Sequence, residues 1–534
     1  MKRKIVSVIL IALIIAGSSM STALAYTGGT QVKEPTQEDI VRFALEHPTG
    51  LVGLDTTGKI VDDYKVPYLV EPILIAPYFA GLLSDEENEN ALNTIKTIRF
   101  IAGINHEVTL SDDYSEKAQA ACMVNYANGN LSHYPKYPQG MDGRLASLGV
   151  EASRYCNLSR YTRANASLKF AIMDGWMSDS DSANISSLGH RRWILNPSMG
   201  AVGFGIVTSE ADRVTYNAMY VRDDTGTDDD YVGIKWPATN MPISCFKAGD
   251  AWSISMNETL STSNIKVSLI KIDNLSSETM KYWNFSSAAS DGDFYVSNSY
   301  YGQTGCIIFR PKGITEYRAG DKYLVSISGL SNEISYTVEF FDMHNFYKPD
   351  KPKLSSVSLS EENYPLVEWG EIENAETYNV YRCVRGSGSK YVKLAENLSE
   401  TAYEDKTASR GVKYYYKVTA VREELGKNYE SDKSGYLKGI IIPLGKTELT
   451  KISSSKNNIF IDWDKVEGRT GYKVYRKAQG SSKYKLIATV KSSCYYDKSA
   501  LRGKKYTYKV RAYKTANSYT VYGEYSKTKS ASRL

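Results

Sequence analysis

The last third of the chain repeats itself, and this internal repeat constrains the fold more than any other feature of the sequence. Trp369 and Trp463 are each followed nine residues later by runs that differ at one position, Tyr-Asn-Val-Tyr-Arg and Tyr-Lys-Val-Tyr-Arg. The alternation of tyrosine and valine is typical of β-strands. Strand-rich units of about 90 to 100 residues with a core tryptophan suit a two-sheet sandwich. We therefore predict two all-β sandwich modules, at residues 351–444 and 445–534.

The two modules resemble fibronectin type III repeats. Trp369 and Trp463 match that family's strand-B tryptophan, and the tyrosine-rich runs that begin at Tyr414 and Tyr506 match its strand F. The resemblance implies modules that act as a spacer. Binding through exposed tyrosine faces would instead make the chain an adhesin that acts through its repeats, and this alternative stays open.

Charge is distributed unevenly along the chain. Residues 445–534 hold 21 lysines and arginines against 6 acidic residues, a net charge of +15. Residues 351–444 balance at 14 against 14, and residues 26–350 carry a net charge of −13, from 27 against 40. A basic module on an acidic or neutral chain indicates a polyanion-binding end. We predict that residues 445–534 bind an anionic cell-wall polymer or glycan, with lipid headgroups as the alternative, and that nucleic acid is not a partner.

Residues 1–25 have the pattern of a secretory signal peptide. Basic residues at positions 2–4 precede an apolar run over 5–16, and Ala23–Ala25 offers a small-residue cleavage site. The apolar run is too short for a membrane span, and no later stretch reaches membrane length. We expect a secreted or extracellular bacterial protein, with no transmembrane segment after signal removal, that associates with the cell wall.

The pattern is helical between residues 84 and 207. Ser84 and Glu87 form a capping-box pattern at the start of a first helix. Ser111 is expected to cap a second helix, and Asn165 a third. Residues 26–83 form a leader segment, in which prolines exclude a long regular helix.

Apolar and polar residues alternate over residues 208–347. Runs such as Trp252–Met256 and Tyr323–Ile327 read as strands. The pattern predicts a separate β-sandwich domain there.

The run Leu188–Pro197, which reads LGHRRWILNP, places His190 before an apolar strand punctuated by Gly203 and Gly205. These two glycines leave room for a close backbone approach. A histidine before such a strand, followed by two arginines and a tryptophan, suggests the wall of a cleft. A buried histidine that bonds to the backbone is the alternative.

This run resembles the signature of the CAP superfamily (SCP-like; cysteine-rich secretory, antigen 5 and pathogenesis-related proteins), in its bacterial form. Three upstream pieces occur in the family's order, namely Ala91–Gly103, Asn130–Pro135 and Trp176–Asp179. The resemblance covers residues 84–207. It implies an α/β/α sandwich at the head of a multidomain chain, with two histidines and two glutamates around one cleft.

The family's cleft residues carry over incompletely. His133 and His190 match the histidines, Asp179 stands where one glutamate is usual, and Cys156 takes the place of the other. The resemblance thus implies a ligand cleft of His133, Cys156, Asp179 and His190. His133, Asp179 and His190 are the candidate ligands of a divalent metal such as zinc. An apo cleft of hydrogen-bonded side chains is the alternative.

Two classes of function follow for the cleft. CAP relatives are mostly regarded as binding or signalling modules, which implies a small ligand, lipid or peptide and no assigned catalytic residue. The alternative is a divalent-metal-dependent peptidase or hydrolase, or a thiol hydrolase that uses Cys156. Phosphate-loop, dinucleotide and CxxC patterns are absent.

Six cysteines in an exported chain permit disulfides. The pairs that would lie within predicted domains are Cys122 with Cys156 and Cys245 with Cys306. Cys383 and Cys494 lie in separate modules and are expected to be lone buried thiols.

Overall fold

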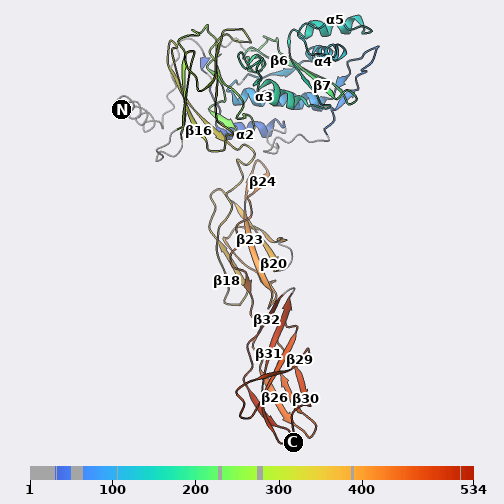
Figure 1. Ribbon diagram of the computed structural model, residues 1–534, viewed down its shortest axis with the longest axis vertical. Helices are drawn as coiled ribbons and strands as arrows, with labels where there is room; N and C mark the ends of the chain where they lie inside the picture. Colours follow the sequence, from blue (N-terminus) through green and yellow to red (C-terminus); the bar gives the residue numbers. More distant parts are fainter. Residues whose placement is uncertain are drawn as a thin grey trace, which may run out of the picture. The chain divides into compact units, whose positions relative to one another are not determined.

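The computed structural model describes residues 30–31, 33–49, 64–104, 106–226, 231–272, 281–385, 390–516 and 519–534. The chain divides into two compact units, one up to Phe346 and the other Tyr347–Leu534 (Figure 1). The predicted signal peptide lies outside the described residues. Within the described ranges, no helix is long and apolar enough to cross a membrane.

The centre of the first unit is a four-stranded sheet with the strand order β4-β6-β7-β5. Its strands are β4 (Thr109–Leu110), β5 (Cys156–Tyr161), β6 (Ala201–Ser209) and β7 (Val214–Tyr220). Helices α3 (Asp85–Ile101) and α4 (Asp112–Ala127) pack on this sheet, α5 (Gly143–Ala152) packs on α4, and α7 (Gly189–Ile194) precedes β6 in the chain. Because β7 pairs with both β5 and β6, the boundary predicted at residue 207 is wrong, and the α/β domain includes β7.

The helix starts follow from capping residues, with one error. Ser84 accepts a hydrogen bond from the backbone N–H of Glu87 (3.2 Å), and Ser111 caps α4 in the same way. The predicted capping box is only half formed, because the side chain of Glu87 points inward and accepts from the N–H of Leu168 (3.3 Å) and not from that of Ser84. The third helix begins after Ser167, not Asn165. It consists of α6 (Leu168–Phe170) followed by the π-helix η1 (Ala171–Trp176).

Gly203 and Gly205 allow α4 to pack directly on β6. A Cβ atom at Gly203 would collide with the backbone at Tyr114 and Ser115, and one at Gly205 with the backbone at Ala118. The close approach predicted from these glycines is confirmed. It fixes α4, and with it the loop that carries His133, against the sheet.

The β-sandwich domain of the first unit has two sheets, with the orders β10-β17-β16-β12-β13 and β14-β15-β11-β9. Their strands are β9 (Ile234–Trp236), β10 (Asn240–Pro242), β11 (Trp252–Ser255), β12 (Lys266–Lys271), β13 (Tyr282–Ser286), β14 (Gly292–Ser297), β15 (Cys306–Pro311), β16 (Lys322–Ser328) and β17 (Ile334–Phe341). Trp252 is fully buried between aromatic neighbours. The predicted strands at Trp252 and Tyr323 are present.

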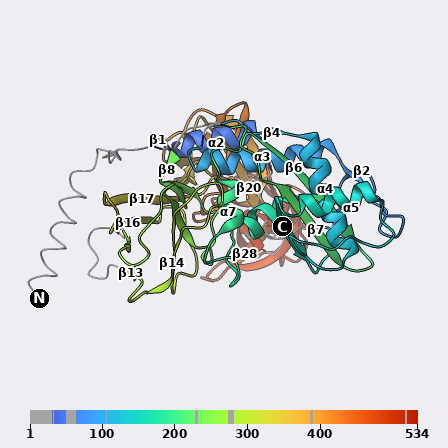
Figure 2. The same ribbon diagram turned by 90° about the horizontal axis from the view of Figure 1, so that it is seen from above.

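The leader segment belongs to the first unit. Its helix α2 (Gln37–Glu46) lies along α3, where the rings of Phe43 and Phe100 stack at 4.1 Å (Figure 2). Strand β1 (Thr30–Gln31) pairs with β8 (Tyr231–Val232), and β2 (Tyr68–Val70) pairs with β3 (Leu82–Leu83).

The second unit contains the two predicted modules, and their topologies match strand for strand. The first has sheets β18-β19-β22 and β21-β20-β23-β24, with β25 also on β23. Its strands are β18 (Leu354–Leu359), β19 (Pro365–Trp369), β20 (Thr377–Val384), β21 (Val392–Leu398), β22 (Ala402–Glu404), β23 (Lys413–Glu424), β24 (Lys427–Glu430) and β25 (Ile440–Ile441).

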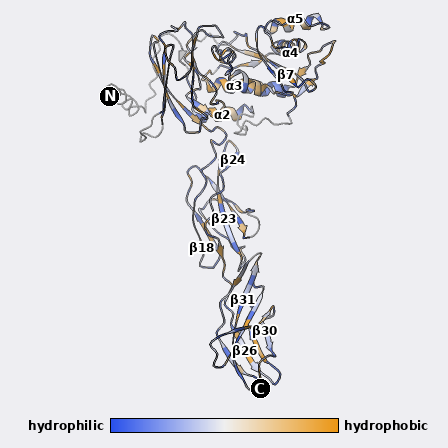
Figure 3. Ribbon diagram, viewed as in Figure 1, coloured by the Kyte–Doolittle hydropathy of each residue, from blue (hydrophilic) through white to orange (hydrophobic). Residues whose placement is uncertain are grey.

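The second module has sheets β26-β27-β30 and β29-β28-β31-β32, with β33 also on β31. Its strands are β26 (Leu449–Ser454), β27 (Ile459–Trp463), β28 (Gly471–Ala478), β29 (Lys485–Val490), β30 (Cys494–Asp497), β31 (Lys505–Ala516), β32 (Tyr519–Tyr522) and β33 (Lys529–Ser532). Trp369 and Trp463 lie in the cores, each on the second strand of its module. Figure 3 shows hydrophobic and hydrophilic residues alternating along these strands.

The two possible disulfide pairs are not formed. Cys122 and Cys156 are free thiols within one hydrophobic cluster, and Cys245 and Cys306 are also buried free thiols. Burial raises the pKa of all four thiols. In the second unit Cys383 is buried as expected, whereas Cys494 is only half-buried.

Each module buries one carboxylate that ties its two sheets together. In the second module the Asp497 side chain is fully buried and accepts hydrogen bonds from Arg476, Ser499 and Tyr508, each at 2.7 Å. Asp405 has the equivalent partners in the first module. Burial favours a raised pKa for Asp497, but these hydrogen bonds outweigh it, and the pKa is lowered.

We expect Asp497→Asn to destabilise the second module by about 3 kcal/mol, because it leaves Arg476 beside an uncharged amide. Lowered hydrogen-exchange protection of β28 and β31 would show this loss. Asp464→Asn, at an exposed neighbouring carboxylate, is the matched control. Since the folded pKa is depressed, the contribution of Asp497 is complete above the unfolded pKa of about 4. It is lost as the pH falls through the folded value. Equal protection in both variants would contradict this role.

Candidate functional site

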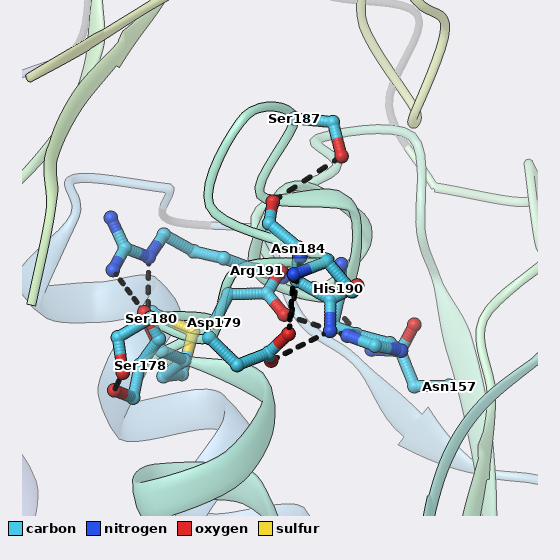
Figure 4. A network of polar contacts seen from close by, with 11 residues as sticks. Asn157, Ser178, Asp179, Ser180, Asn184, Ser187, His190 and Arg191 are labelled. Atoms are coloured by element: carbon cyan, nitrogen blue, oxygen red, sulfur yellow. Dashed lines mark hydrogen bonds and ion pairs between the residues drawn. The ribbon is translucent and has the colours of Figure 1, made fainter. Parts of the chain in front are cut away.

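A buried carboxylate and a histidine form the centre of the candidate site (Figure 4). The Nδ1 atom of His190 lies 2.7 Å from Oδ1 of Asp179. The other carboxylate oxygen, Oδ2, accepts from the backbone N–H groups of His190 (2.9 Å) and Arg191 (3.3 Å). The Asp179 side chain is 1% exposed and that of His190 is 19% exposed. The two residues predicted to share the cleft are therefore in direct contact.

Backbone conformation places these two residues. Asp179 follows the π-helix and adopts φ +47°, and Leu188 precedes α7 at φ +49°. Left-handed backbone costs non-glycine residues about 1–3 kcal/mol each. Leu188 offers no side-chain cap to α7, so its first N–H groups need another acceptor. The carboxylate of Asp179, eleven residues before His190, is that acceptor. These hydrogen bonds offset the cost of the left-handed backbone at Asp179 and Leu188.

His133 and His190 are held at opposite ends of the segment Ser153–Asn157. Its Nδ1 atom is 2.8 Å from the carbonyl oxygen of Ser153, and the side-chain amide of Asn157 donates to the carbonyl oxygen of His190 (3.0 Å). Ser153 and Asn157 are four residues apart, so their Cα atoms are separated by at most about 14 Å. Both histidines are therefore attached to the same short segment.

Cys156 does not join the site. Its side chain packs in the hydrophobic cluster with Cys122 and Leu158. Successive residues of a strand face opposite sides, so the cysteine points into the core and Asn157 reaches His190. Asn157 was not among the predicted site residues. In the CAP family the glutamate at the position of Cys156 usually begins a Glu-Asn pair, and Asn157 stands at the second place of that pair.

The two arginines after His190 are structural. Arg191 is fully buried and donates to the carbonyl oxygens of Met177, Ser178 and Ala251. Arg192 donates to the carbonyl oxygens of Ser187, Ser299 and Gln303, and to the hydroxyl of Ser297. Ala251, Ser297, Ser299 and Gln303 belong to the β-sandwich domain, so the residues that follow His190 join the two domains.

The predicted metal set is not assembled in this structure. The described residues include no group of three or more His, Cys, Asp or Glu side chains placed to hold a metal ion. Both carboxylate oxygens of Asp179 are used by His190 and Arg191. Asp179 has the position of a residue that orients an imidazole, which is distinct from the position of a metal ligand.

Among the described residues, the Nε2 atom of neither imidazole has a hydrogen-bond partner. With Nδ1–H donated to Asp179 or Ser153, the Nε2 atoms of His190 and His133 are hydrogen-bond acceptors. Among the described residues no hydroxyl or thiol bonds to the His190 ring. The hydroxyl of Ser132 accepts from the N–H of Tyr134 (3.0 Å) and does not face His133. The site can accept a proton or a hydrogen bond, but no described side chain is placed as its nucleophile.

A groove of about 970 Å³ lies away from these histidines, on the β-sandwich domain. It is lined by Tyr282, Asp293, Arg310 and Lys312, among others. Arg310 also donates to the carbonyl oxygen of Ser180, next to Asp179. We place the candidate site at His190 because the oriented imidazole is there.

We expect Asp179→Asn to release the His190 ring. The amide keeps one oxygen for the backbone N–H groups and turns its NH2 group toward Nδ1. Because that NH2 group donates, Nδ1 must accept, and the Nε2–H tautomer gains population. Imidazole ¹⁵N chemical shifts of histidine-labelled protein report the tautomer. Asp181→Asn is the control, because the side chain of Asp181 accepts from Ala183 and Asn184 and no hydrogen bond to the His190 ring is recorded for it among the described residues. Unchanged His190 shifts in the Asp179 variant would contradict the assignment.

We expect residues 33–226, which keep the whole α/β sheet, to fold poorly without the β-sandwich domain. Arg191 and Arg192 would lose the acceptors at Ala251, Ser299 and Gln303 while remaining in an apolar environment. Residues 33–347 should unfold cooperatively in urea. The shorter fragment should show weak near-ultraviolet dichroism and bind hydrophobic dye. Equal cooperativity in the two fragments would show that the arginines do not couple the domains.

Comparison with known proteins identifies the α/β domain. Residues 92–221 match CAP, the cysteine-rich secretory protein family. Three amylopullulanases are 38% identical to short segments of the chain. They come from Thermoanaerobacterium saccharolyticum (64 residues, 12% of this chain and 5% of the enzyme), Thermoanaerobacterium thermosulfurigenes (60 residues, 11% and 3%) and Thermoanaerobacter thermohydrosulfuricus (55 residues, 10% and 4%). The matches thus span 3–5% of the length of these enzymes.

Solved structures of fibronectin type III modules are also similar. A two-module segment of chicken tenascin is 13% identical with a TM-score of 0.25, and the match covers 34% of this chain and 97% of the segment. An Fn3-like protein from Clostridium thermocellum is 33% identical with a TM-score of 0.15, and the match covers 17% and 92%. Residues 92–221 are thus the part of the chain that matches the CAP family, and the chain continues as a β-sandwich domain and two further β-sandwich modules of matching topology.

Proposed function

We propose that the chain is exported and that its second fibronectin-like repeat holds it to an anionic cell-wall polymer or glycan. In this proposal the CAP domain presents the His190 site to a small ligand, lipid or peptide. The pattern at residues 1–25 and the net charge of residues 445–534 support export and polyanion binding. The observation that carries the proposal is the outer face of one sheet in the second repeat.

That outer face, which we call the basic face, is built from alternating cations and tyrosines. Strands β28 and β31 place Tyr475 opposite Lys509 and Lys473 opposite Arg511. The residues of the basic face are Lys473, Tyr475, Lys477, Tyr484, Lys509, Arg511, Tyr513, Tyr522 and Tyr525.

The cations of the basic face are held by rings and not by carboxylates. Lys509 lies 3.6 Å from the ring centroid of Tyr525, and the guanidinium of Arg511 lies 3.9 Å from that of Tyr522. In the part of the chain that the structure describes, no ion pair involves Lys473, Lys477, Lys509 or Arg511. Cation–π contacts order a charge without neutralising it. The positive charge therefore remains available to a polyanion.

The first repeat provides an internal comparison. At the position of Tyr522 it has Glu430, since Val421 pairs with Glu430 as Tyr513 pairs with Tyr522. Hydrogen bonds from Asn379, Tyr381 and Thr419 converge on Oε1 of Glu430. The equivalent face of the first repeat thus carries a carboxylate beside its lysines, Lys417 and Lys433, and is less positive than the basic face. Polyanion binding is expected of the second repeat only.

We expect the double variant Lys473→Gln/Arg511→Gln to bind isolated Gram-positive cell walls at least tenfold more weakly than the unaltered chain in 0.1 M salt. Lys451→Gln/Lys456→Gln removes the same charge from exposed positions outside the basic face and should weaken binding less than threefold. Sedimentation with the walls measures both variants. Binding of the unaltered chain should weaken as salt rises, because exposed charges are screened.

Two outcomes would contradict the proposal. Equal losses in the two double variants would mean that net charge alone binds the wall, which contradicts the role of the basic face. No binding by the unaltered chain would remove the tether altogether, although the CAP site would still be open to a ligand.

A further inference from the structure

We infer that the surface beside His190 binds an acidic saccharide, through arginine and aromatic side chains supplied by the CAP domain and the β-sandwich domain together. This inference rests on the proposed function in one respect, that the CAP site has a ligand. It names the chemistry of that ligand.

An aromatic surface extends from His190 across the domain boundary. Trp193 lies three residues after His190 on α7, so the two side chains are neighbours on the helix surface. The rings of Tyr300 and Tyr301, from the β-sandwich domain, lie 5.9 and 6.4 Å from the Trp193 ring, almost perpendicular to it. A Cβ atom at Gly189 would come within 2.8 Å of the Tyr301 ring, so the glycine permits this approach. Tyr300 is 60% exposed.

An exposed arginine stands over this surface. The guanidinium of Arg222 lies 4.9 Å from the ring centroid of Trp193 and 5.8 Å from that of Tyr155. Arg222 forms no ion pair with any residue that the structure describes. The neighbouring Asp223 is buried, and it accepts from Gly200, Ala201, Thr225 and Tyr114. The positive charge of Arg222 is therefore held in place and left unpaired.

The same combination occurs beside His133. The exposed guanidinium of Arg154 lies 5.4 Å from the ring centroid of Tyr134, which is 75% exposed. Arg154 adjoins Ser153, whose carbonyl oxygen holds the His133 ring. No ion pair to Arg154 is present among the described residues. Each histidine thus has an aromatic ring and an unpaired guanidinium near it, and the segment from Ser153 to Asn157 links the two groups.

These groups fit a ligand with rings, hydroxyls and carboxylates. The faces of sugar rings pack on tryptophan and tyrosine, and a guanidinium binds a carboxylate in a bidentate manner. The open Nε2 atoms of the histidines accept hydrogen bonds from hydroxyls. A neutral saccharide would leave Arg154 and Arg222 without partners. Two such groups linked by the five-residue segment Ser153–Asn157 suit an oligosaccharide better than a single acidic sugar.

The test uses the full chain with Lys473→Gln/Arg511→Gln, so that the basic face contributes little. Calorimetric titration with trigalacturonate is compared with its neutral counterpart, galactotriose. We expect trigalacturonate to bind at least tenfold more tightly. Arg222→Gln should remove at least tenfold of that affinity, and Arg222→Lys should recover only part, because an ammonium lacks the guanidinium fork.

Two further variants keep the inference falsifiable if Arg222→Gln loses stability. Tyr300→Ala removes a side chain that is largely exposed and should weaken trigalacturonate at least threefold without lowering the melting temperature. Arg144→Gln, at an 83% exposed arginine that pairs with Glu116, should leave affinity unchanged.

Equal affinity for the two trisaccharides, or no effect of either Arg222→Gln or Tyr300→Ala, would overturn the inference. Failure of the tether appears in the cell-wall assay alone, because this titration takes place on a background without the basic face. Failure of the saccharide inference leaves the wall assay unchanged.

Discussion

The first unit depends on two guanidinium groups that are buried away from water. Arg191 and Arg192 are 0% and 3% exposed, and their acceptors come partly from the CAP domain and partly from the β-sandwich domain. A buried charge without its acceptors costs several kcal/mol, so each domain completes the fold of the other. His190 precedes these arginines directly. Its position is therefore set by the domain interface as well as by Asp179, and the β-sandwich domain is part of the site's foundation.

Much of the fold could be predicted because local rules and the final contacts agree. Ser84 and Ser111 cap their helices through hydrogen bonds to residues three positions away, which the sequence alone indicates. Gly203 lets α4 approach β6 because it has no side chain. The third helix could not be located, since Asn165 and Ser167 are both good caps. A distant contact decides between them, because the buried carboxylate of Glu87 accepts from the N–H of Leu168. The π-helix that follows has no local signal in the sequence.

The site was predictable in its residues more than in their roles. His133, Asp179 and His190 came from the family's pattern, but the same residue types serve as metal ligands or as hydrogen-bonded orienting groups. The two roles differ in what the Asp179 carboxylate oxygens face, a metal ion or the N–H groups of His190 and Arg191. Tertiary structure decides which of these they face. Cys156 and Asn157 show a related limit. The register of β5 in the sheet decides whether Cys156 or Asn157 faces the site. The family pattern does not determine that register when one of its positions is substituted.

Net charge is a poor guide to the electrostatic field that a ligand meets, because several carboxylates are buried among hydrogen-bond donors while some cations stay exposed and form no ion pair with any described residue. Asp497 and Asp223 each accept hydrogen bonds from several donors and face inward. Arg222 and Arg511 lie against aromatic rings without ion pairs among the described residues. A segment whose overall charge is −13 can therefore present a positive, aromatic surface beside His190. The overall charge pointed to polyanion binding by the last module alone, whereas the arrangement of paired acids and unpaired cations extends the same chemistry to the CAP domain.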